Sequence, residues 1–577
     1  MSLPPAVTTP PETHAATPTE TYVDTPLQPG QIRVFHIKPA RQLDDPIQGY
    51  FSVRAVLLTT EQDSYRDETS TPSFRAADWL PRQYDCARYI ALSYAWGSPA
   101  LTRHVLCGGR LIPVTESLYT ALWRLRAHLD SESFAGHFDN VASYARKPTS
   151  RSAIWADGIC IDQGHIKERN SQVQAMGQIY SSASLLVIWL GEQLEGLHTI
   201  PEKGLGLDVV RAILQAPWFK RRWVIQEFRS SPPNRYFLLG GQLQRTQDVE
   251  LSLRTLTSVE AVQLRQRAGP MQFPGAHRAP LLQELIVNQD AVCSDPKDCV
   301  HALLGICPDA TWLDVDYSRS WEEIYTMVAR HYVQRRGTAL DVVRLLAAAV
   351  LRTQRRGVPN ETLPSWVPDW RQSPSQTLAR GLHRGLQSED ARSLRTSADA
   401  VSRGFTFRHQ SHTLKEWADQ SLRIQETRFR LRDDHSVSAE GWLVDAALCR
   451  ATSLDHMLVM THCDDADFRD LERHSGHSQP LLGDYLRDSK PSAADRLWLP
   501  GCAMDDGGEH KMPTRRYWPA FVLRPAADRG AGGYLVQDCV MLAEETRWPY
   551  HFQGRSRADV KPSEHFFLRP PVTVIIV

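Results

Sequence analysis

Several polar and aromatic residues stand where two apolar runs of the chain end. Tyr94 and Trp96 follow the first run, beside Ser93, and their rings could stack on a planar ligand. Asp157 follows the second run, and its carboxylate could accept hydrogen bonds from ribose hydroxyls. The same residues have plainer interpretations, because Tyr94 and Trp96 could pack in the core and Asp157 could cap a turn. For Asp157 we favour the turn.

An Arg-rich helix predicted over residues 218–228 adds two charged candidates. Glu227 could supply a carboxylate that stabilises positive charge developing on a reacting carbon. Arg221 could contact a phosphate through both terminal nitrogens of its guanidinium group. The alternative is an ion pair, between Glu227 and Arg221, Arg222 or Arg229, and exposed pairs at a helix end contribute little to stability. The residue types alone leave this choice open.

The elements that must position these residues alternate between strand and helix. Apolar runs that end in turn signals predict buried strands, and the segments between them have helical spacing. The strands are predicted at 89–96, 153–161, 185–190 and 235–239, and the helices at 114–129, with Thr115 as N-cap, 166–183, 205–214 and 218–228. This order predicts an α/β fold with a mainly parallel sheet covered by helices on both faces. Ligands of such sheets lie beyond the carboxyl ends of the strands, so Ser93, Trp96, Asp157 and Glu227 are expected to converge on one concavity.

Composition and charge exclude several classes of protein. Hydrophobic residues make up 42% of the 577 positions, and 66 basic side chains balance 66 acidic ones, which removes the electrostatic argument for nucleic acid or an anionic membrane as partner. The apolar runs are too short to span a bilayer, and the chain opens with no secretory signal pattern. Ten scattered cysteines without a CxxC pair argue against a structural zinc site and favour reduced thiols in a cytoplasmic protein. The common hydrolase, metalloprotease, NTPase and dinucleotide-binding motifs do not occur.

Composition also predicts how the chain is divided. Residues 1–30 are rich in Pro and Thr and predict a disordered tail. An α/β domain is predicted over 31–310 and a helical extension over 311–370. Residues 371–435 have weak periodicity and predict a linker or insertion of low order, with a short helix around 414–424. Short strand-like runs over 436–577 predict a smaller β-rich lobe.

Three longer motifs carry a resemblance to a known family. Residues 89–97 read YIALSYAWG, residues 154–163 read IWADGICIDQ, and residues 218–227 read WFKRRWVIQE. In this order the chain resembles the fungal heterokaryon-incompatibility (HET) domain family. The stretches 295–305 and 363–370 are similar to segments that lie after the domain in many members.

The chain departs from the family pattern at a few positions. Asp162 stands where the family usually has Asn, and this change adds a carboxylate to a loop at a strand end. Cys299 and His301 stand where basic and aromatic residues are common. The Asp162 change places any ligand contact of that loop in question.

The resemblance implies a filamentous-fungal protein of non-self recognition and regulated cell death. HET domains also resemble TIR domains, which have a flavodoxin-like fold and some of which cleave the nicotinamide–ribose bond of NAD. In active TIR enzymes the catalytic glutamate lies four residues after a helix tryptophan, as Glu227 lies after Trp223 here. By this analogy Glu227 is the catalytic residue, and Ser93, Tyr94, Trp96, Asp157 and Arg221 bind the substrate NAD, with no cofactor or metal.

Two other functions fit the same residues. The chain could be a non-catalytic signalling adaptor whose corresponding surface self-associates or binds a protein partner that triggers the response. It could also be a family member repurposed for specialised metabolism. Release of nicotinamide and ADP-ribose from NAD by the purified protein distinguishes the enzyme from the adaptor.

Overall fold

The computed structural model describes the chain in segments that form two compact units. The described segments are 27–40, 42, 44–56, 89–129, 153–195, 205–255, 279–336, 339–350, 363–371, 404–407, 429–445, 450–454, 457–461, 496–500, 504–505, 516–526, 533–544 and 572–576. One unit comprises residues 1–281 and 291–318, and the other comprises 282–290 and 319–577. All but the last four residues of the predicted tail, and the predicted helix at 414–424, lie outside the described residues.

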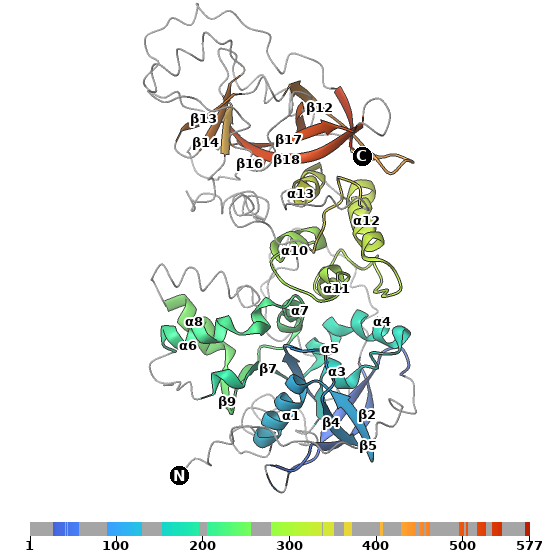
Figure 1. The fold of residues 1–577 in the computed structure, drawn as a ribbon, viewed down its shortest axis with the longest axis vertical. Coiled ribbons are helices and arrows are strands. Elements are labelled where there is room, and N and C mark those ends of the chain that lie inside the picture. Colours follow the sequence, from blue (N-terminus) through green and yellow to red (C-terminus); the bar gives the residue numbers. More distant parts are fainter. Residues whose placement is uncertain are drawn as a thin grey trace, which may run out of the picture. The chain divides into compact units, whose positions relative to one another are not determined.

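The first unit is built on a sheet of nine strands among the described residues (Figure 1). Its order is β5-β4-β2-β1-β6-β3-β7-β8-β9. The bounds are β1 Gln31–Ile37, β2 Gln48–Ala55, β3 Ile90–Tyr94, β4 Arg103–Cys107, β5 Arg110–Val114, β6 Ala153–Trp155, β7 Leu185–Gly191, β8 Arg235–Leu239 and β9 Gln242–Arg245. The four predicted strands are β3, β6, β7 and β8, and they lie side by side as β6-β3-β7-β8 with parallel pairing throughout. In chain order this is 2-1-3-4, the arrangement with which flavodoxin-like doubly wound sheets begin.

The sheet as a whole is mixed, which corrects the expectation of a mainly parallel sheet. Four pairings are parallel, and four are antiparallel. The antiparallel pairings come from the hairpins β1–β2 and β4–β5, from β1 against β6, and from the edge strand β9. Half-polar sequences such as QGYFSVRA in β2 carry no continuous apolar run, so the sequence analysis did not identify them as strands.

The crossovers place helices on opposite faces of the parallel strands. From β3 the chain moves to β6 in one direction, and from β6 it moves to β7 in the other, and right-handed crossovers then put the two connections on different faces. The first connection holds α1, Glu116–Leu129, and Thr115 caps it by accepting a hydrogen bond from Leu118 N at 3.3 Å, as predicted. The second holds α4, Ile166–Gln174, and α5, Met176–Ser182. Helix α7, Trp223–Ser230, in the next connection packs against α5 (Figure 1).

Three predicted elements are shorter or divided. The strand predicted at 153–161 ends at Trp155, and its remainder forms the helical turn α3, Asp157–Cys160. Its apolar side chains are buried, and a short apolar run is typical of a buried strand and of a buried helix alike, so the sequence pattern did not reveal the helical turn. The helix predicted at 166–183 breaks at Ala175, and Ile166 is exposed rather than in its apolar stripe. The helix predicted at 218–228 divides into the 3₁₀ turn η5, Pro217–Lys220, and α7.

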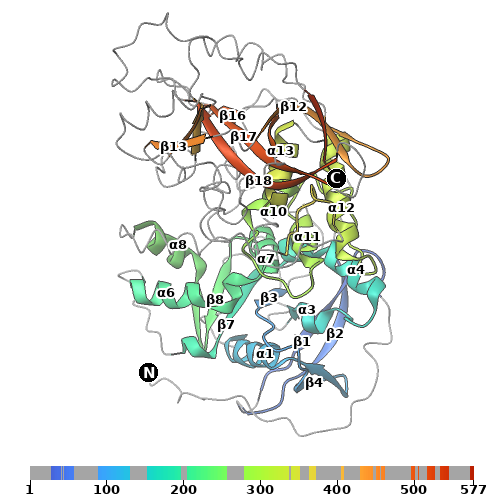
Figure 2. The same ribbon diagram turned by 45° about the horizontal axis from the view of Figure 1, so that its top comes forward.

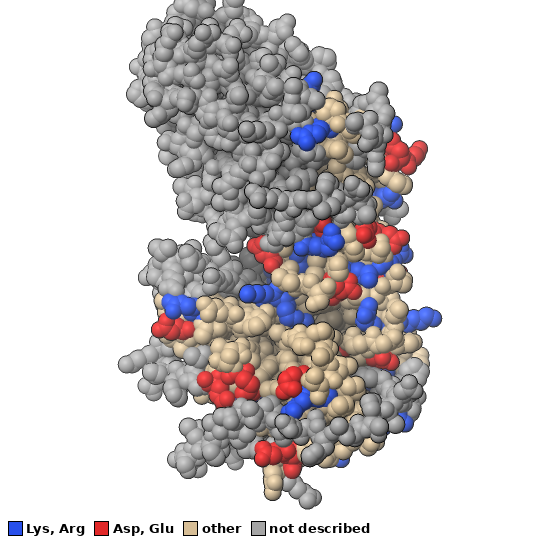
Figure 3. Space-filling view, in the orientation of Figure 1, with Lys and Arg blue, Asp and Glu red and all other residues tan. Residues whose placement is uncertain are grey.

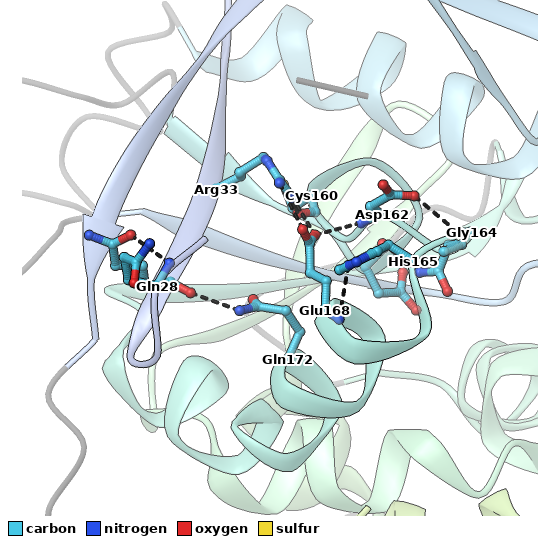
Figure 4. A network of polar contacts seen from close by, with 11 residues as sticks. Gln28, Arg33, Cys160, Asp162, Gly164, His165, Glu168 and Gln172 are labelled. Carbon is cyan, nitrogen blue, oxygen red and sulfur yellow. Dashed lines mark hydrogen bonds and ion pairs between the residues drawn. The ribbon is translucent and has the colours of Figure 1, made fainter. Parts of the chain in front are cut away.

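A buried ion pair joins the N-terminal strand β1 to the first turn of α4 (Figure 4). Arg33 binds both carboxylate oxygens of Glu168, the second at 2.8 Å, and it also donates to the Cys160 carbonyl oxygen at 3.4 Å. Glu168 accepts a further hydrogen bond from Asp162 N at 2.8 Å. Burial raises the pKa of Glu168, but the Arg33 guanidinium and the Asp162 amide outweigh it and hold the pKa below its ordinary value. Glu168 therefore has a structural role, as its place in the first helical turn predicts.

The second unit contains the C-terminal sheet. Ten strands pair among its described residues, in the order β13-β14-β10-β18-β19-β12-β15-β17-β16 with β11 on β12. Helix α12, Trp321–His331, begins with a capping box at Ser320 and Glu323, and α13, Ala339–Val350, packs against β18 (Figure 2). The strands are β10 Gly404–Phe407, β11 Arg430–Leu431, β12 Val437–Asp445, β13 Arg450–Leu454, β14 Met457–Thr461, β15 Arg496–Pro500, β16 Met504–Asp505, β17 Arg516–Pro525, β18 Gly533–Glu544 and β19 Val572–Ile576. The predicted β-rich lobe is confirmed, and β10 and β11 join it from the segment for which we predicted a linker.

The buried ion pair gives a stability prediction. Arg33→Met leaves the Glu168 carboxylate, whose side chain is 8% exposed, without its cation, and should lower the free energy of unfolding by about 3–5 kcal/mol. The control is Arg211→Met, because Arg211 pairs with an Asp208 side chain that is 91% exposed, and this loss should be about 0–1 kcal/mol. Urea denaturation followed by circular dichroism measures both. Equal losses would show that the Arg33–Glu168 pair stabilises the folded protein no more than an exposed ion pair does.

Candidate functional site

A hydrogen-bonded chain of side chains lies at the carboxyl end of β3. Ser93, the fourth residue of β3, donates its hydroxyl hydrogen to Glu227 Oε2. The Ser93 oxygen in turn accepts a hydrogen bond from the Trp218 indole nitrogen at 2.6 Å. All three side chains are buried, and they come from β3, η5 and α7. The third sequence motif therefore folds back onto the first.

Arg221 lies next to the carboxylate at the end of this series of hydrogen bonds. It lies in the break between η5 and α7, where Arg221 pairs with Val292 as a short parallel bridge. Its guanidinium donates to the Tyr94 carbonyl oxygen and lies 3.9 Å from Glu227 Oε1. Its side chain is 21% exposed, so Arg221 connects the buried carboxylate to the surface. The predicted pairing of Arg221 with Glu227 is present, but it is not the exposed helix-end pair that the sequence analysis considered.

Trp96, Asp157 and Tyr94 form the outer part of the cluster. The Trp96 indole nitrogen donates to Asp157 Oδ2 at 2.9 Å, and Gly158 N donates to the other carboxylate oxygen at 2.7 Å. The Tyr94 hydroxyl is hydrogen-bonded to Asp157, and burial raises the pKa of Tyr94 well above its ordinary value, followed by the effect of the Asp157 charge. Trp96 and Asp157 are half-buried, whereas Tyr94 is 2% exposed.

This arrangement divides the predicted ligand contacts. Trp96 and Asp157 are accessible in part, and Asp157 also has the turn-forming role that we favoured, because it begins α3. Tyr94 packs in the core and presents its hydroxyl to the turn, where a Cβ on Gly158 would clash with it. The ring of Tyr94 is therefore not free to stack on a ligand in this structure.

Burial dominates the electrostatics of Glu227. Removal from water raises the pKa of Glu227 to about 7, and the neighbouring Asp157 charge acts in the same direction. The Arg221 guanidinium and the Ser93 hydrogen bond oppose this rise by favouring the charged form. A carboxyl group whose pKa is raised toward neutral pH is typical of groups that transfer a proton during catalysis.

The cluster lies at the point where the strand order reverses. The chain leaves β3 for β6 on one side and later returns to β7 on the other, and ligands of doubly wound sheets bind at such switch points. Ser93, Trp96, Asp157 and Glu227 belong to this one cluster, although Glu227 is only 1% exposed. A ligand can thus reach the Glu227 carboxylate only after neighbouring side chains move.

The position of Glu227 in its helix differs from the prediction, and two of its neighbours, Trp218 and Tyr180, were not predicted. Glu227 lies in the middle of α7 rather than at its end, and the helix carries it into the core. Trp223 is hydrogen-bonded to Asp298, and the indole within the cluster belongs to Trp218. The Tyr180 ring of α5 also adjoins the cluster, because the charge of Glu227 contributes to the raised pKa of Tyr180. Trp218 stood in the third motif, and this was the one signal that could have identified it.

Other candidate positions lie outside the cluster. The Asp162 carboxylate accepts a hydrogen bond from Gly164 N at 3.0 Å and so closes a turn (Figure 4). Cys160 is fully buried, and burial raises the pKa of its thiol to about 12, which agrees with an inert core cysteine. Among the described residues, no three His, Cys, Asp or Glu side chains are grouped so as to hold a metal ion.

Comparison with known protein families agrees with the first two of the three motifs, residues 89–97 and 154–163. Residues 89–203 match the model of the heterokaryon incompatibility protein family, HET. This segment of the chain is therefore similar to a HET domain. A curated relative is the heterokaryon incompatibility protein 6, OR allele, of Neurospora crassa, with 27% identity over 389 residues, covering 51% of this chain and 54% of the relative. The chain thus spans about half the length of the curated relative that it matches, and no solved structure matches it at a significant level.

The matched segment of the HET domain contains only part of the cluster. Ser93, Trp96 and Asp157 lie within residues 89–203, whereas Arg221 and Glu227 come later in the chain.

On the face of the molecule in Figure 3, acidic and basic side chains of the described residues are interspersed rather than gathered by sign. None of the helices in the described part of the chain is long and apolar enough to cross a membrane.

The raised pKa of Glu227 predicts a pH-dependent stability. The folded protein binds this proton more tightly than the unfolded chain, so stability is lost as pH rises from about 4.5 through about 7. A shift of this size corresponds to roughly 3 kcal/mol. Glu227→Gln keeps the shape and an acceptor for Ser93 without the ionisation. The difference in unfolding free energy between the variant and the wild type should therefore grow by up to this amount between pH 4.5 and 8. If the unfolding free energies of the variant and the wild type differed by the same amount at every pH, Glu227 would not titrate with a raised pKa in the folded protein.

Proposed function

We propose that this HET-domain protein acts in fungal heterokaryon incompatibility, the recognition of non-self that ends in regulated cell death. The family match over residues 89–203 and the similarity to the Neurospora crassa relative support this role. Because the chain spans about half of that relative, the proposal concerns in the first place the segment that matches the family model, residues 89–203. Its action requires a trigger, either self-association or a protein partner.

We infer that the chemical activity is hydrolysis of the nicotinamide–ribose bond of NAD at Glu227. The observation that carries this proposal is the buried Glu227 carboxylate, hydrogen-bonded to Ser93 at the switch point of the sheet and balanced near neutral pH. A flavodoxin-like strand order among the four parallel strands agrees with the TIR analogy. The likeness is one of fold and residue spacing, and the activity itself is tested by nicotinamide release.

The roles of the residues follow from their charge and position. Cleavage of the glycosidic bond develops positive charge on the ribose carbon, and an ionised Glu227 would stabilise it. Ser93 holds the carboxylate in one orientation, and Trp218 fixes the Ser93 oxygen. Arg221, which reaches from the surface to Glu227, would contact the phosphates, and Asp157 would accept hydrogen bonds from the ribose. Binding must move Arg221 or its neighbours, because the carboxylate is buried before the substrate arrives.

The same burial supports a second candidate, the non-catalytic adaptor. Glu227 has a hydroxyl donor and a nearby cation, which together satisfy a buried carboxylate without any ligand. In that case the cluster fixes the loops at the strand ends, and the partly exposed Trp96 and Asp157 would belong to a surface that binds a protein.

The decisive measurement is nicotinamide release by the purified full-length protein. We expect Glu227→Gln to reduce the rate by about a hundred- to a thousandfold, because it removes one well-placed electrostatic contribution. The matched control is Asp162→Asn, which removes a carboxylate that closes a turn outside the cluster, and this variant should retain the wild-type rate. Since the carboxylate form is needed, kcat/KM should rise as pH passes through about 7.

Two results would decide against this activity. A Glu227→Gln variant with the wild-type melting temperature and the wild-type rate would exclude Glu227 as the catalytic residue. A wild-type protein that releases no nicotinamide, even after enforced oligomerisation, would leave the adaptor as the supported function.

A further inference from the structure

Two cysteine side chains lie in contact next to the cluster. The Sγ atoms of Cys293 and Cys299 are 2.8 Å apart, and neither cysteine is in a disulfide bond. Cys299 is the second residue of α11, Asp298–Leu304, and Cys293 lies in the loop that leads into this helix. Neither has a place in the mechanism proposed for NAD hydrolysis. The two sulfur atoms are close because the loop folds back onto the first turn of the helix.

The geometry suits a disulfide bond. A disulfide has a sulfur–sulfur distance of about 2.05 Å, so the two Sγ atoms need to approach by less than about 1 Å. The Cys293 side chain is half-buried and can be reached by a small oxidant, whereas Cys299 is 3% exposed. This difference gives the two thiols distinct roles, because the accessible sulfur is oxidised first and the buried sulfur resolves the product.

The segment that carries Cys293 is bonded to the turn that carries Arg221. Val292 N donates to the Lys220 carbonyl oxygen at 2.7 Å, and Arg222 N donates to the Val292 carbonyl oxygen at 3.0 Å. The Arg222 guanidinium also donates to the Cys299 carbonyl oxygen at 3.0 Å. Arg222 is therefore hydrogen-bonded both to the residue before Cys293 and to Cys299 itself. Its neighbour in sequence, Arg221, contacts Glu227.

We propose that Cys293 and Cys299 form a redox modification site that takes a hydroperoxide as oxidant and stiffens the segment holding Arg221. The Cys293 thiol attacks hydrogen peroxide, becomes a sulfenic acid and releases one water. The Cys299 thiol then displaces the sulfenic hydroxyl as a second water, and the disulfide forms. The peroxide gains the two electrons that the sulfurs lose, and a dithiol reductant reverses the modification. Neither the disulfide nor the stiffening of this segment depends on the proposed hydrolysis of NAD.

The reaction is expected to be slow. The hydrogen bond with Cys299 and burial raise the pKa of the Cys293 thiol, which keeps the reactive thiolate scarce at neutral pH. Oxidation should therefore be followed over minutes to hours. Once formed, the bond closes the loop of residues 293–299 and restricts the backbone that pairs with residues 220–222.

Peptide mapping of the full-length protein tests the bond itself. Lys297 lies between the two cysteines, so trypsin separates residues 279–297 from 298–319, and these two peptides stay linked only through a disulfide. After treatment with hydrogen peroxide and alkylation, we expect the linked pair in the wild type, and its loss with dithiothreitol. Fragment ions of the linked pair should place the bond on Cys299 rather than on Cys307, which shares its peptide.

Matched variants distinguish the proposed pair from its neighbour. Cys307→Ser should still form the linked peptides, whereas Cys293→Ser and Cys299→Ser should not. Absence of the linked pair in the oxidised wild type, or its persistence in Cys299→Ser, would overturn the site. Both results are independent of any NAD cleavage, so they separate a failure of the redox site from a failure of the enzyme.

Hydrogen exchange tests the coupling to the cluster. The oxidised protein should exchange the backbone amides of residues 220–227 at least several-fold more slowly than the reduced protein, with no change in α1, residues 116–129. Equal exchange rates in residues 220–227 would show that the disulfide does not reach the segment holding Arg221.

Discussion

The first unit depends on the presence of a carboxylate inside its core. Removing Glu227 from water is costly unless donors and a cation replace the lost solvation, and Ser93 and Arg221 supply them. These partners come from a strand end and from the break between η5 and α7, so the chain must be irregular where a continuous helix would be simpler. The break at residues 221–222 turns Arg221 back onto the Tyr94 carbonyl oxygen. The break between η5 and α7 thus lies where Arg221 reaches both the Glu227 carboxylate and the Tyr94 carbonyl oxygen.

The cluster has an inner and an outer part with different physical characters. The inner part, Ser93, Trp218 and Glu227, is buried and fixed by hydrogen bonds. In the outer part, Trp96 and Asp157 are half-buried, and the Trp96 indole nitrogen donates a hydrogen bond to the Asp157 carboxylate. Such a division separates the group whose charge is tuned by burial from the groups that remain accessible from solvent. It applies equally to an enzyme and to an adaptor, since either requires a fixed interior and a partly accessible surface.

The sequence was sufficient for strands that are mostly apolar and insufficient for strands that mix polar and apolar residues. Strands β3, β7 and β8 are mostly apolar, and their parallel order follows from the helices between them. The hairpins β1–β2 and β4–β5 mix polar and apolar side chains, so their pairing depends on long-range contacts that periodicity does not reveal. The site residues could be named from motifs, but the burial of Glu227 could not. Local sequence around residue 227 is rich in arginine, and only the packing of α7 shows which side faces inward.

The pairing of β1 with β6 has a consequence for what counts as the folding unit. The segment that matches the family model, residues 89–203, begins after β1 and ends before β8. Cut out alone, it would present β6 and β7 as bare edges, each with a row of unpaired backbone groups open to another chain. It would also lack Arg33, the cation that pairs with the buried Glu168 carboxylate. It would lack Glu227 as well, the buried acid that accepts the Ser93 hydrogen bond. The segment defined by sequence similarity is therefore smaller than the compact unit that contains it, which comprises residues 1–281 and 291–318.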